Sequence, residues 1–379
     1  MKFVHLSDIH IGKKVNGFSM LNDQKHILKK IIEVIDSEKP DVVMIAGDVY
    51  DKTVPPAEAV EVLDDFLYSL SKRKVQVFII SGNHDSPERL SFGSRLIDSS
   101  GIHLSPVYRG IVEPFVLKDE YGPVNVYMLP FVKPSLVRPY FPETKIESYD
   151  DAIETVVENM QINTDERNVL IAHQFVTGAS RSESEEISVG GTDNVSAEIF
   201  ECFDYTALGH IHGPQNIGSE RIRYCGTPLK YSFSEVSHKK SVTVLEMNEK
   251  GNTDLYTIPL EPMHDMVSIR GSYDEITLKS YYNKLKSTED YMSITLTDED
   301  DIPDAVSKLR VIYPNLMKLE YDNIRTRTNN EIDGAVDVEN KTPSELFSEF
   351  YLLENGSEMS SEQTEFVEKL IEEIWEDEK

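Results

Sequence analysis

Five short segments of the sequence combine aspartate, asparagine and histidine at the spacing of metal ligands. They read Asp8-x-His10, Gly47-Asp48-x-x-Asp51, Gly82-Asn83-His84-Asp85, His173 and Gly209-His210-Ile211-His212. Imidazole and carboxylate together suit divalent ions such as manganese, iron or zinc. Each segment alone is ordinary, because Asp, Asn and Gly are common in turns and a single histidine often follows a strand. Their ordered conjunction predicts one metal site.

Seven of these residues are the expected metal ligands. They are Asp8, His10, Asp48, Asn83, His173, His210 and His212. A catalytic zinc normally takes three protein ligands, so seven predict two ions that share a bridging carboxylate. Paired ions about 3.5–4 Å apart stabilise the attacking and leaving oxygens of a phosphoryl displacement, and they lower the pKa of a shared water. A histidine beside the metals but not bound to them could protonate the leaving oxygen.

Each segment follows a short apolar run, so strands must position the ligands. The runs are "KFVHLSD", "DVVMIAGD", "VQVFIISGNHD", "VYMLP", "NVLIAHQ" and "YTALGHIH". Continuous apolar runs indicate strands buried on both faces, and ligands gather beyond the carboxyl ends of such strands. We therefore expect one cluster beyond one sheet edge. Asp8 and His10 are two residues apart, so on a strand both would reach one ion while Ile9 points into the fold.

Helices alternate with these strands. Apolar stripes at 3.6-residue spacing predict helices over Asp23–Lys39 and Ala57–Lys72. The fold class expected for residues 1–260 is therefore α/β, a layered sheet domain. Shorter alternating strands then predict a small α+β capping domain over residues 261–326.

The end of the chain has a different pattern. Residues 327–341 have no apolar period and indicate a linker, and residues 342–379 predict a pair of helices. Thr342-Pro343-Ser344-Glu345 is one expected capping box, and Ser360 with Gln363 is a second. The helices could pack on each other or on their own body, but the preceding linker favours docking to a partner.

Composition restricts the class of protein. The 379 residues carry 38 basic and 67 acidic side chains, a net charge of −29, which is not typical of a simple nucleic-acid binder. No apolar run approaches the roughly 18 residues of a membrane span, and the first residues do not resemble a signal peptide. The only cysteines, Cys202 and Cys225, form no CxxC pair. We expect a cytoplasmic protein that does not contact a membrane.

The order of these motifs resembles the calcineurin-like metallophosphoesterase superfamily. Within it, the chain resembles the SbcD family of bacterial nuclease subunits, through "HLSDIHIGK", "IAGDVYD", "SGNHDSPERL", "LGHIHGPQ" and "YCGTPLKYSFSE". The resemblance implies a role for each motif residue. Asp8, His10 and His212 would hold the first ion, Asn83, His173 and His210 the second, Asp48 would bridge them, His84 would act on the leaving group, and Asp51 would orient His84.

The same resemblance implies an activity and partners. It implies two Mn²⁺ ions and a DNA nuclease for repair and recombination, both a double-strand exonuclease and a single-strand or hairpin endonuclease. The partners would be DNA ends and hairpins, an SbcC-like coiled-coil ATPase, and a second copy in a homodimer within a heterotetramer. The chain has no G-x-x-x-x-G-K-[ST] motif, so ATP dependence must come from another subunit.

Two other functions remain open. A calcineurin-like phosphatase acting on nucleotides or phosphoproteins would need the same ions and water, so the metal motifs do not exclude it. A scaffold with an inactive site is less favoured, because no expected ligand position is missing.

Overall fold

The computed structural model describes residues 1–185, 193–324 and 326, with the pairs 347–348, 351–352, 359–360, 363–364 and 366–367. The chain divides into two compact units. The first comprises Met1–Ile269, Thr277–Ile294 and Asp304–Leu319, and the second comprises Arg270–Ile276, Thr295–Pro303 and Glu320–Lys379. The division predicted from the sequence at residues 260, 326 and 341 stays a prediction. The predicted linker and the first capping box lie outside the described residues, as does most of the helical pair.

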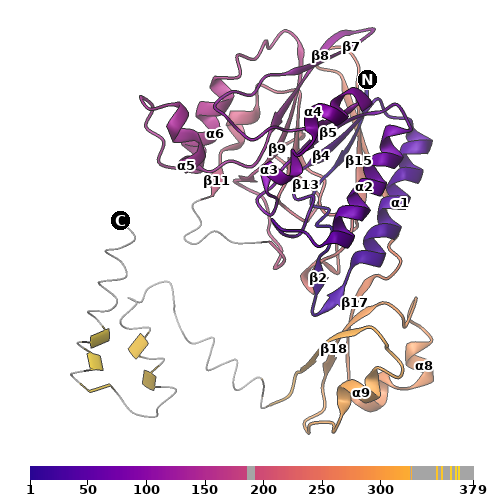
Figure 1. Cartoon of the computed structure of the whole chain (residues 1–379). Coiled ribbons are helices and arrows are strands. Elements are labelled where there is room, and N and C mark those ends of the chain that lie inside the picture. The colour runs from indigo at the N-terminus through magenta and orange to yellow at the C-terminus, as the bar shows by residue number, and fades with distance from the viewer. Residues whose placement is uncertain are drawn as a thin grey trace. The chain divides into compact units, whose positions relative to one another are not determined.

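Two six-stranded sheets form the centre of the first unit (Figure 1). In order, the first sheet contains β16 (Thr253–Pro259), β15 (Ser241–Met247), β1 (Lys2–Leu6), β4 (Val42–Ala46), β5 (Gln76–Ile80) and β6 (Ile102–Leu104). The second contains β13 (Gln215–Ile217), β14 (Ser219–Tyr224), β12 (Tyr205–Gly209), β9 (Arg167–His173), β8 (Gly122–Leu129) and β7 (Phe115–Asp119). The strands that precede the ligand motifs pair in parallel within each sheet, so their carboxyl ends share an edge.

Helices cover the outer faces of the two sheets. Helices α1 (Leu21–Glu38) and α2 (Ala57–Ser71) lie along one side in Figure 1, as the apolar stripes predict, and α6 (Tyr149–Glu158) lies on the other. Apolar residues of α1 and α2 share a core with Val4 and Val43 of the first sheet. The predicted α/β class is confirmed.

The inner faces of the sheets pack against each other. Phe3, Phe78 and Met44 of the first sheet share a buried core with Ile171 and Tyr205 of the second. The continuous apolar runs therefore do mark strands buried on both faces. They do not tell which element buries each face, and here a helix covers one and the other sheet covers the opposite one. The expectation of one sheet edge beneath the site is consequently wrong.

The remaining elements are short. They are β2 (Lys14–Val15), β3 (Phe18–Ser19), α3 (Pro87–Leu90), α4 (Ser94–Ile97), η1 (Asp98–Ser100), α5 (Pro134–Val137), η2 (Arg138–Tyr140), β10 (Phe175–Val176), β11 (Asn194–Val195), η3 (Ala197–Phe200), η4 (Phe233–Glu235), α7 (Tyr273–Ile276), α8 (Lys279–Tyr282) and α9 (Ala305–Leu309). A separate three-stranded sheet has the order β17 (Met266–Gly271), β18 (Tyr291–Leu296) and β19 (Leu316–Tyr321).

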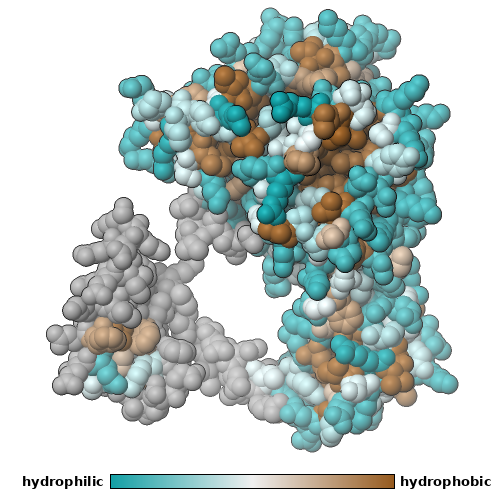
Figure 2. Space-filling view, viewed as in Figure 1, coloured by the Kyte–Doolittle hydropathy of each residue, from teal (hydrophilic) through white to brown (hydrophobic). Residues whose placement is uncertain are grey.

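Two further predictions concern the second capping box and contact with a membrane. The expected capping box at Ser360 forms, because Ser360 N–H donates to Gln363 Oε1 at 2.8 Å and Gln363 N–H donates to Ser360 Oγ at 3.3 Å. Among the described residues, no helix is both long and apolar enough to cross a membrane. On the face shown in Figure 2, hydrophilic side chains dominate and the apolar ones lie in separate patches.

Candidate metal centre

The carboxyl ends of both sheets meet at the predicted ligands. Asp8 and His10 follow β1, Asp48 follows β4, and Asn83 follows β5, all in the first sheet. The second sheet contributes three histidines: His173 ends β9, while His210 and His212 follow β12. The structure brings all seven together, although Asp8 and His212 are more than 200 positions apart in the chain.

The ligand loops adopt left-handed backbone conformations. The φ angles are +50° at Asp8, +48° at His10, +47° at Asp48 and +99° at His210. Such conformations cost about 1–3 kcal/mol each in residues other than glycine, and they concentrate at functional sites. Strand β1 ends at Leu6, so the expectation that Asp8 and His10 share the face of a strand is wrong.

Hydrogen bonds between loops hold this strained turn. Asp8 N–H donates to Gly47 O at 3.1 Å, and His10 N–H donates to Asp48 O at 2.9 Å. Ile9 is fully buried between them, as predicted. The turn, rather than a strand pleat, therefore directs both ligands into the site.

Two glycines allow the loops to approach closely. Gly47 has φ +83°, and a Cβ there would collide with the imidazole of His173. At Gly82 the φ angle is ordinary, but a Cβ would collide with the carboxylate of Asp48. The glycines that precede the ligands are thus required for space as well as for turning.

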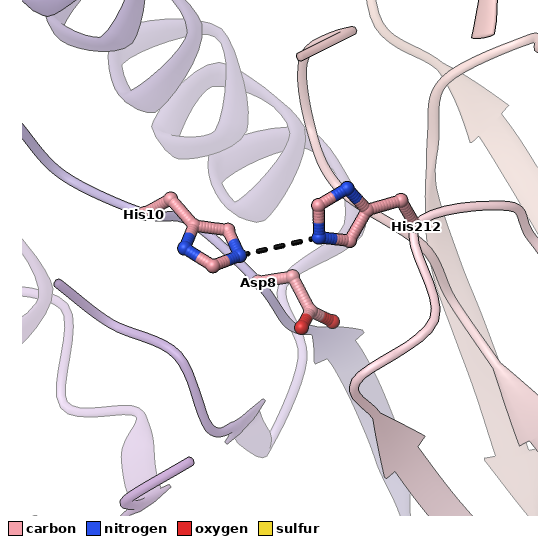
Figure 3. A group of neighbouring side chains, drawn as sticks. All are labelled: Asp8, His10 and His212. Carbon is pink, nitrogen blue, oxygen red and sulfur yellow. Dashed lines mark hydrogen bonds between the residues drawn. The ribbon is translucent and has the colours of Figure 1, made fainter. Parts of the chain in front are cut away.

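The first group of ligands consists of Asp8, His10 and His212. One ligand atom from each lies within 4.8 Å of the others. His10 and His212 come from different loops, and Figure 3 shows their rings pointing toward each other above Asp8. The two Nε2 atoms are 3.2 Å apart.

The second group surrounds Asn83. Its Oδ1 lies 3.0 Å from His173 Nε2 and 3.0 Å from His210 Nδ1. Asp48 lies between the groups, because its Oδ2 is 3.3 Å from His173 Nε2 and 3.7 Å from His10 Nε2. His173 Nδ1 is 2.8 Å from the carbonyl of Ala46. A carbonyl only accepts, so Nδ1 carries a proton, and in the neutral ring Nε2 is the nitrogen that can bind a metal.

Burial and charge shift the ionisation of these groups in opposite directions. Burial raises the pKa of Asp8 to about 6, and it lowers the pKa of His210 to about 3. Burial alone would raise the pKa of Asp48 and lower that of His173, but each stabilises the charged form of the other. The pKa of Asp48 is therefore held well below its usual value, and that of His173 rises to about 9.

The donor set fits divalent cations. His10 Nδ1 and His210 Nε2 are buried and have no hydrogen-bond partner in the part of the chain that the structure describes. The other nitrogens of these rings, His10 Nε2 and His210 Nδ1, face the two groups of predicted ligands. Carboxylate, amide and imidazole lone pairs that converge in one buried space are the ligands of borderline divalent ions.

His84 lies beside the two groups. The backbone N–H of His84 donates to Asp48 Oδ1 at 2.9 Å, and the ring nitrogen Nε2 is 4.0 Å from Asp48 Oδ2. Its Nδ1 donates to the main-chain carbonyl of Asp51 at 3.1 Å. The Asp51 carboxylate instead accepts from Lys13 Nζ at 2.8 Å. Asp51 therefore contacts His84 through its backbone, which the sequence did not indicate.

Two residues that hold the ligand loops in place, Asp85 and Tyr231, were not predicted to do so from the sequence. The buried Asp85 carboxylate accepts the N–H groups of Val49 at 3.1 Å, Tyr50 at 2.9 Å and Gly82 at 2.9 Å. Tyr231 donates its hydroxyl to Ile9 O. Asp85 lies in "SGNHDSPERL" and Tyr231 lies in "YCGTPLKYSFSE", so the sequence carried a signal from which both residues could have been identified.

The chain is similar to known proteins along most of its length. Residues 1–214 match the calcineurin-like phosphoesterase family, and residues 262–355 match the type 5 capsule protein repressor C-terminal domain. The chain is 32% identical over 375 residues to the SbcD subunit of nuclease SbcCD from Staphylococcus epidermidis, covering 98% of each chain. A dimetal phosphatase from Danio rerio is a structural neighbour at 11% identity and a TM-score of 0.40, covering 69% of this chain and 96% of that one. This chain therefore belongs to the calcineurin-like phosphoesterase family and, within it, is a homologue of the nuclease subunit SbcD.

Proposed function

We propose that this chain is the nuclease subunit of an SbcCD-type complex and hydrolyses phosphodiester bonds of DNA with two Mn²⁺ ions. The observation that carries the proposal is the convergence of seven oxygen and nitrogen ligands in a buried site, in a chain related to the nuclease subunit SbcD along its whole length. Left-handed conformations in residues other than glycine concentrate at functional sites, and four of them lie in these loops.

The ligands divide between two ions in this proposal. Asp8, His10 and His212 would hold the first ion, and Asn83, His173 and His210 the second. Asp48 would bridge them, supported by the position of its Oδ2 between His173 and His10. Two divalent ions held there would supply an activated water and positive charge for the transferred phosphoryl group.

We assign His84 to the leaving group. The Asp51 carbonyl accepts from Nδ1–H, so Nε2 is the atom that faces the site and can move a proton. Asp51 fixes the ring in this orientation through its main chain. A histidine placed in this way can act as general acid toward the departing alkoxide.

DNA binding and assembly complete the proposal. Lys13 is 15% exposed beside the site, and it could meet a phosphate. The chain has a net charge of −29. An SbcC-like ATPase, docked through residues 342–379, would therefore supply much of the DNA affinity. A homodimer is supported by exposed apolar side chains that follow the Gly82–Asp85 segment, Phe92 at 87% and Leu96 at 83%. A cytoplasmic location stays a prediction.

The decisive experiment is DNA cleavage. Purified protein, with and without its ATPase partner, is incubated with Mn²⁺ and blunt duplex or hairpin DNA. We expect Asp48→Ala and His84→Ala to lose cleavage, the first with loss of the metal pair and the second with Mn²⁺ binding retained. His26→Ala, on α1 outside the metal centre, is the matched control and should cleave normally.

Two results would contradict the proposal. Equal cleavage by wild type and His84→Ala would remove His84 from its assigned role. Hydrolysis of small phosphomonoesters without cleavage of DNA would favour the phosphatase instead.

A further inference from the structure

A hydroxyl and a carboxylate lie behind His212, on the side of the ring away from the other ligands. Ser184 Oγ is 2.7 Å from His212 Nδ1, and Glu235 Oε1 is 3.3 Å from the same nitrogen. Ser184 comes from the loop after β10, whereas Glu235 ends η4. Neither residue belongs to a metal-ligand motif.

The hydrogen-bond donors and acceptors around Ser184 determine where the protons of this network lie. Ser184 Oγ lies 2.5 Å from Glu235 Oε1. A carboxylate only accepts, and a hydroxyl bonds to a charged acceptor more strongly than to a neutral one. Ser184 therefore donates its proton to Glu235, and its oxygen accepts from His212. It follows that Nδ1 of His212 carries a proton and Nε2 carries a lone pair.

Glu235 is held as a charged group. Its side chain is fully buried, and Lys240 Nζ lies 2.5 Å from its Oε2. The Lys240 ammonium at that distance stabilises the carboxylate in its charged form. Lys240 is itself fixed by the carbonyl of His212 at 2.9 Å and by Thr227 Oγ1 at 2.6 Å.

We propose that Ser184 and Glu235 are positioning residues that lock His212 as the Nδ1–H tautomer, so that Nε2 is always available to a divalent cation beside His10 and Asp8. Hydrogen bonds to the second ring nitrogen of a metal-binding histidine fix its tautomer and orientation, and their loss typically lowers metal affinity or activity by about 10–100-fold. The inference rests on the proposed metal centre and deepens it, because it names two residues on which metal binding depends that are not themselves expected ligands.

Ser184→Ala is the primary test. The variant removes the nearer acceptor of His212 Nδ1–H at a half-buried loop position and leaves Glu235 Oε1 3.3 Å from that nitrogen, so the fold should persist. Mn²⁺ alone is titrated into the metal-free full chain by calorimetry. We expect one of the two binding events to weaken by about 10–100-fold and the other to change much less. Ser184→Thr keeps the hydroxyl and should restore binding.

Two further variants complete the design. Glu235→Gln removes the charge that orients Ser184 and should weaken the same binding event. Ser234→Ala is the matched control, because the exposed Ser234 hydroxyl contacts Ser232 Oγ and Glu183 N–H but not His212. It should bind Mn²⁺ as wild type does.

The outcomes separate this inference from the proposed function. If wild type binds no Mn²⁺, the proposed metal centre fails and the inference fails with it. If wild type binds two ions and folded Ser184→Ala binds both within twofold of wild type, only the role of Ser184 and Glu235 is overturned.

Discussion

The buried carboxylate of Asp85 ties two ligand loops together. It accepts Val49 N–H and Tyr50 N–H, just after Asp48, and also Gly82 N–H, just before Asn83. Burial raises the pKa of Asp85 to about 6, so the group is largely ionised at pH 8. Removing it should loosen both loops at once.

The size of the effect depends on the substitution. Each buried donor left without an acceptor costs about 1–3 kcal/mol. Asp85→Ala leaves three backbone N–H groups without an acceptor and should lower the free energy of unfolding by about 3–6 kcal/mol. The loss is smaller than the sum of three such costs, because water can reach the N–H of Tyr50. In Asp85→Asn, Oδ1 can turn toward Val49 and Gly82, which both bond to one carboxylate oxygen. Only Tyr50 then loses its acceptor, for about 1–3 kcal/mol.

The assay is urea unfolding at pH 8, combined with calorimetric titration of Mn²⁺. The midpoint should fall from wild type to Asp85→Asn and further to Asp85→Ala, with Mn²⁺ affinity falling in the same order. Asp41→Asn is the control, because this exposed carboxylate accepts a single N–H, from Lys2. The reasoning is refuted if Asp85→Ala unfolds at the wild-type midpoint, or if Asp85→Asn is the less stable of the two.

Three further predictions concern binding, pH and assembly. Saturating Mn²⁺ should raise the thermal midpoint of wild type, because a ligand at 100 times its Kd adds about 2.7 kcal/mol to the free energy of unfolding. Scanning calorimetry of Asp48→Ala should show little or no rise. Arg167 holds the pKa of Asp119 well below its usual value, so this pair stabilises the fold fully above about pH 4, and the stabilisation is lost progressively as the pH falls from there toward the depressed pKa; the difference in urea midpoint between wild type and Asp119→Asn should therefore be larger at pH 7 than at pH 3. Leu96→Asp should convert the proposed dimer to monomer in light scattering, whereas Val311→Asp, at an equally exposed position (85%), should not.

Local sequence determined the elements and the ligand types. Runs such as "DVVMIAGD" specify buried strands because their residues are apolar and β-branched, and α1 and α2 follow from stripes at helical spacing. The identities of Asp48 and Asn83 as oxygen donors also need no structure, since they follow from residue type and from position after a strand. These features depend on neighbours within a few positions.

Tertiary structure decided how those residues meet. Two sheets rather than one bring His212 to His10, 202 positions earlier in the chain, and no local pattern encodes that contact. Loop-to-loop hydrogen bonds force Asp8 and His10 into left-handed conformations that side chains normally disfavour. Ser184 and His212 are 28 positions apart in the chain and contact each other only in the folded structure. The sequence thus names the seven expected ligands, whereas the packing of two sheets sets their geometry, because hydrogen bonds between distant loops overrule local backbone preference.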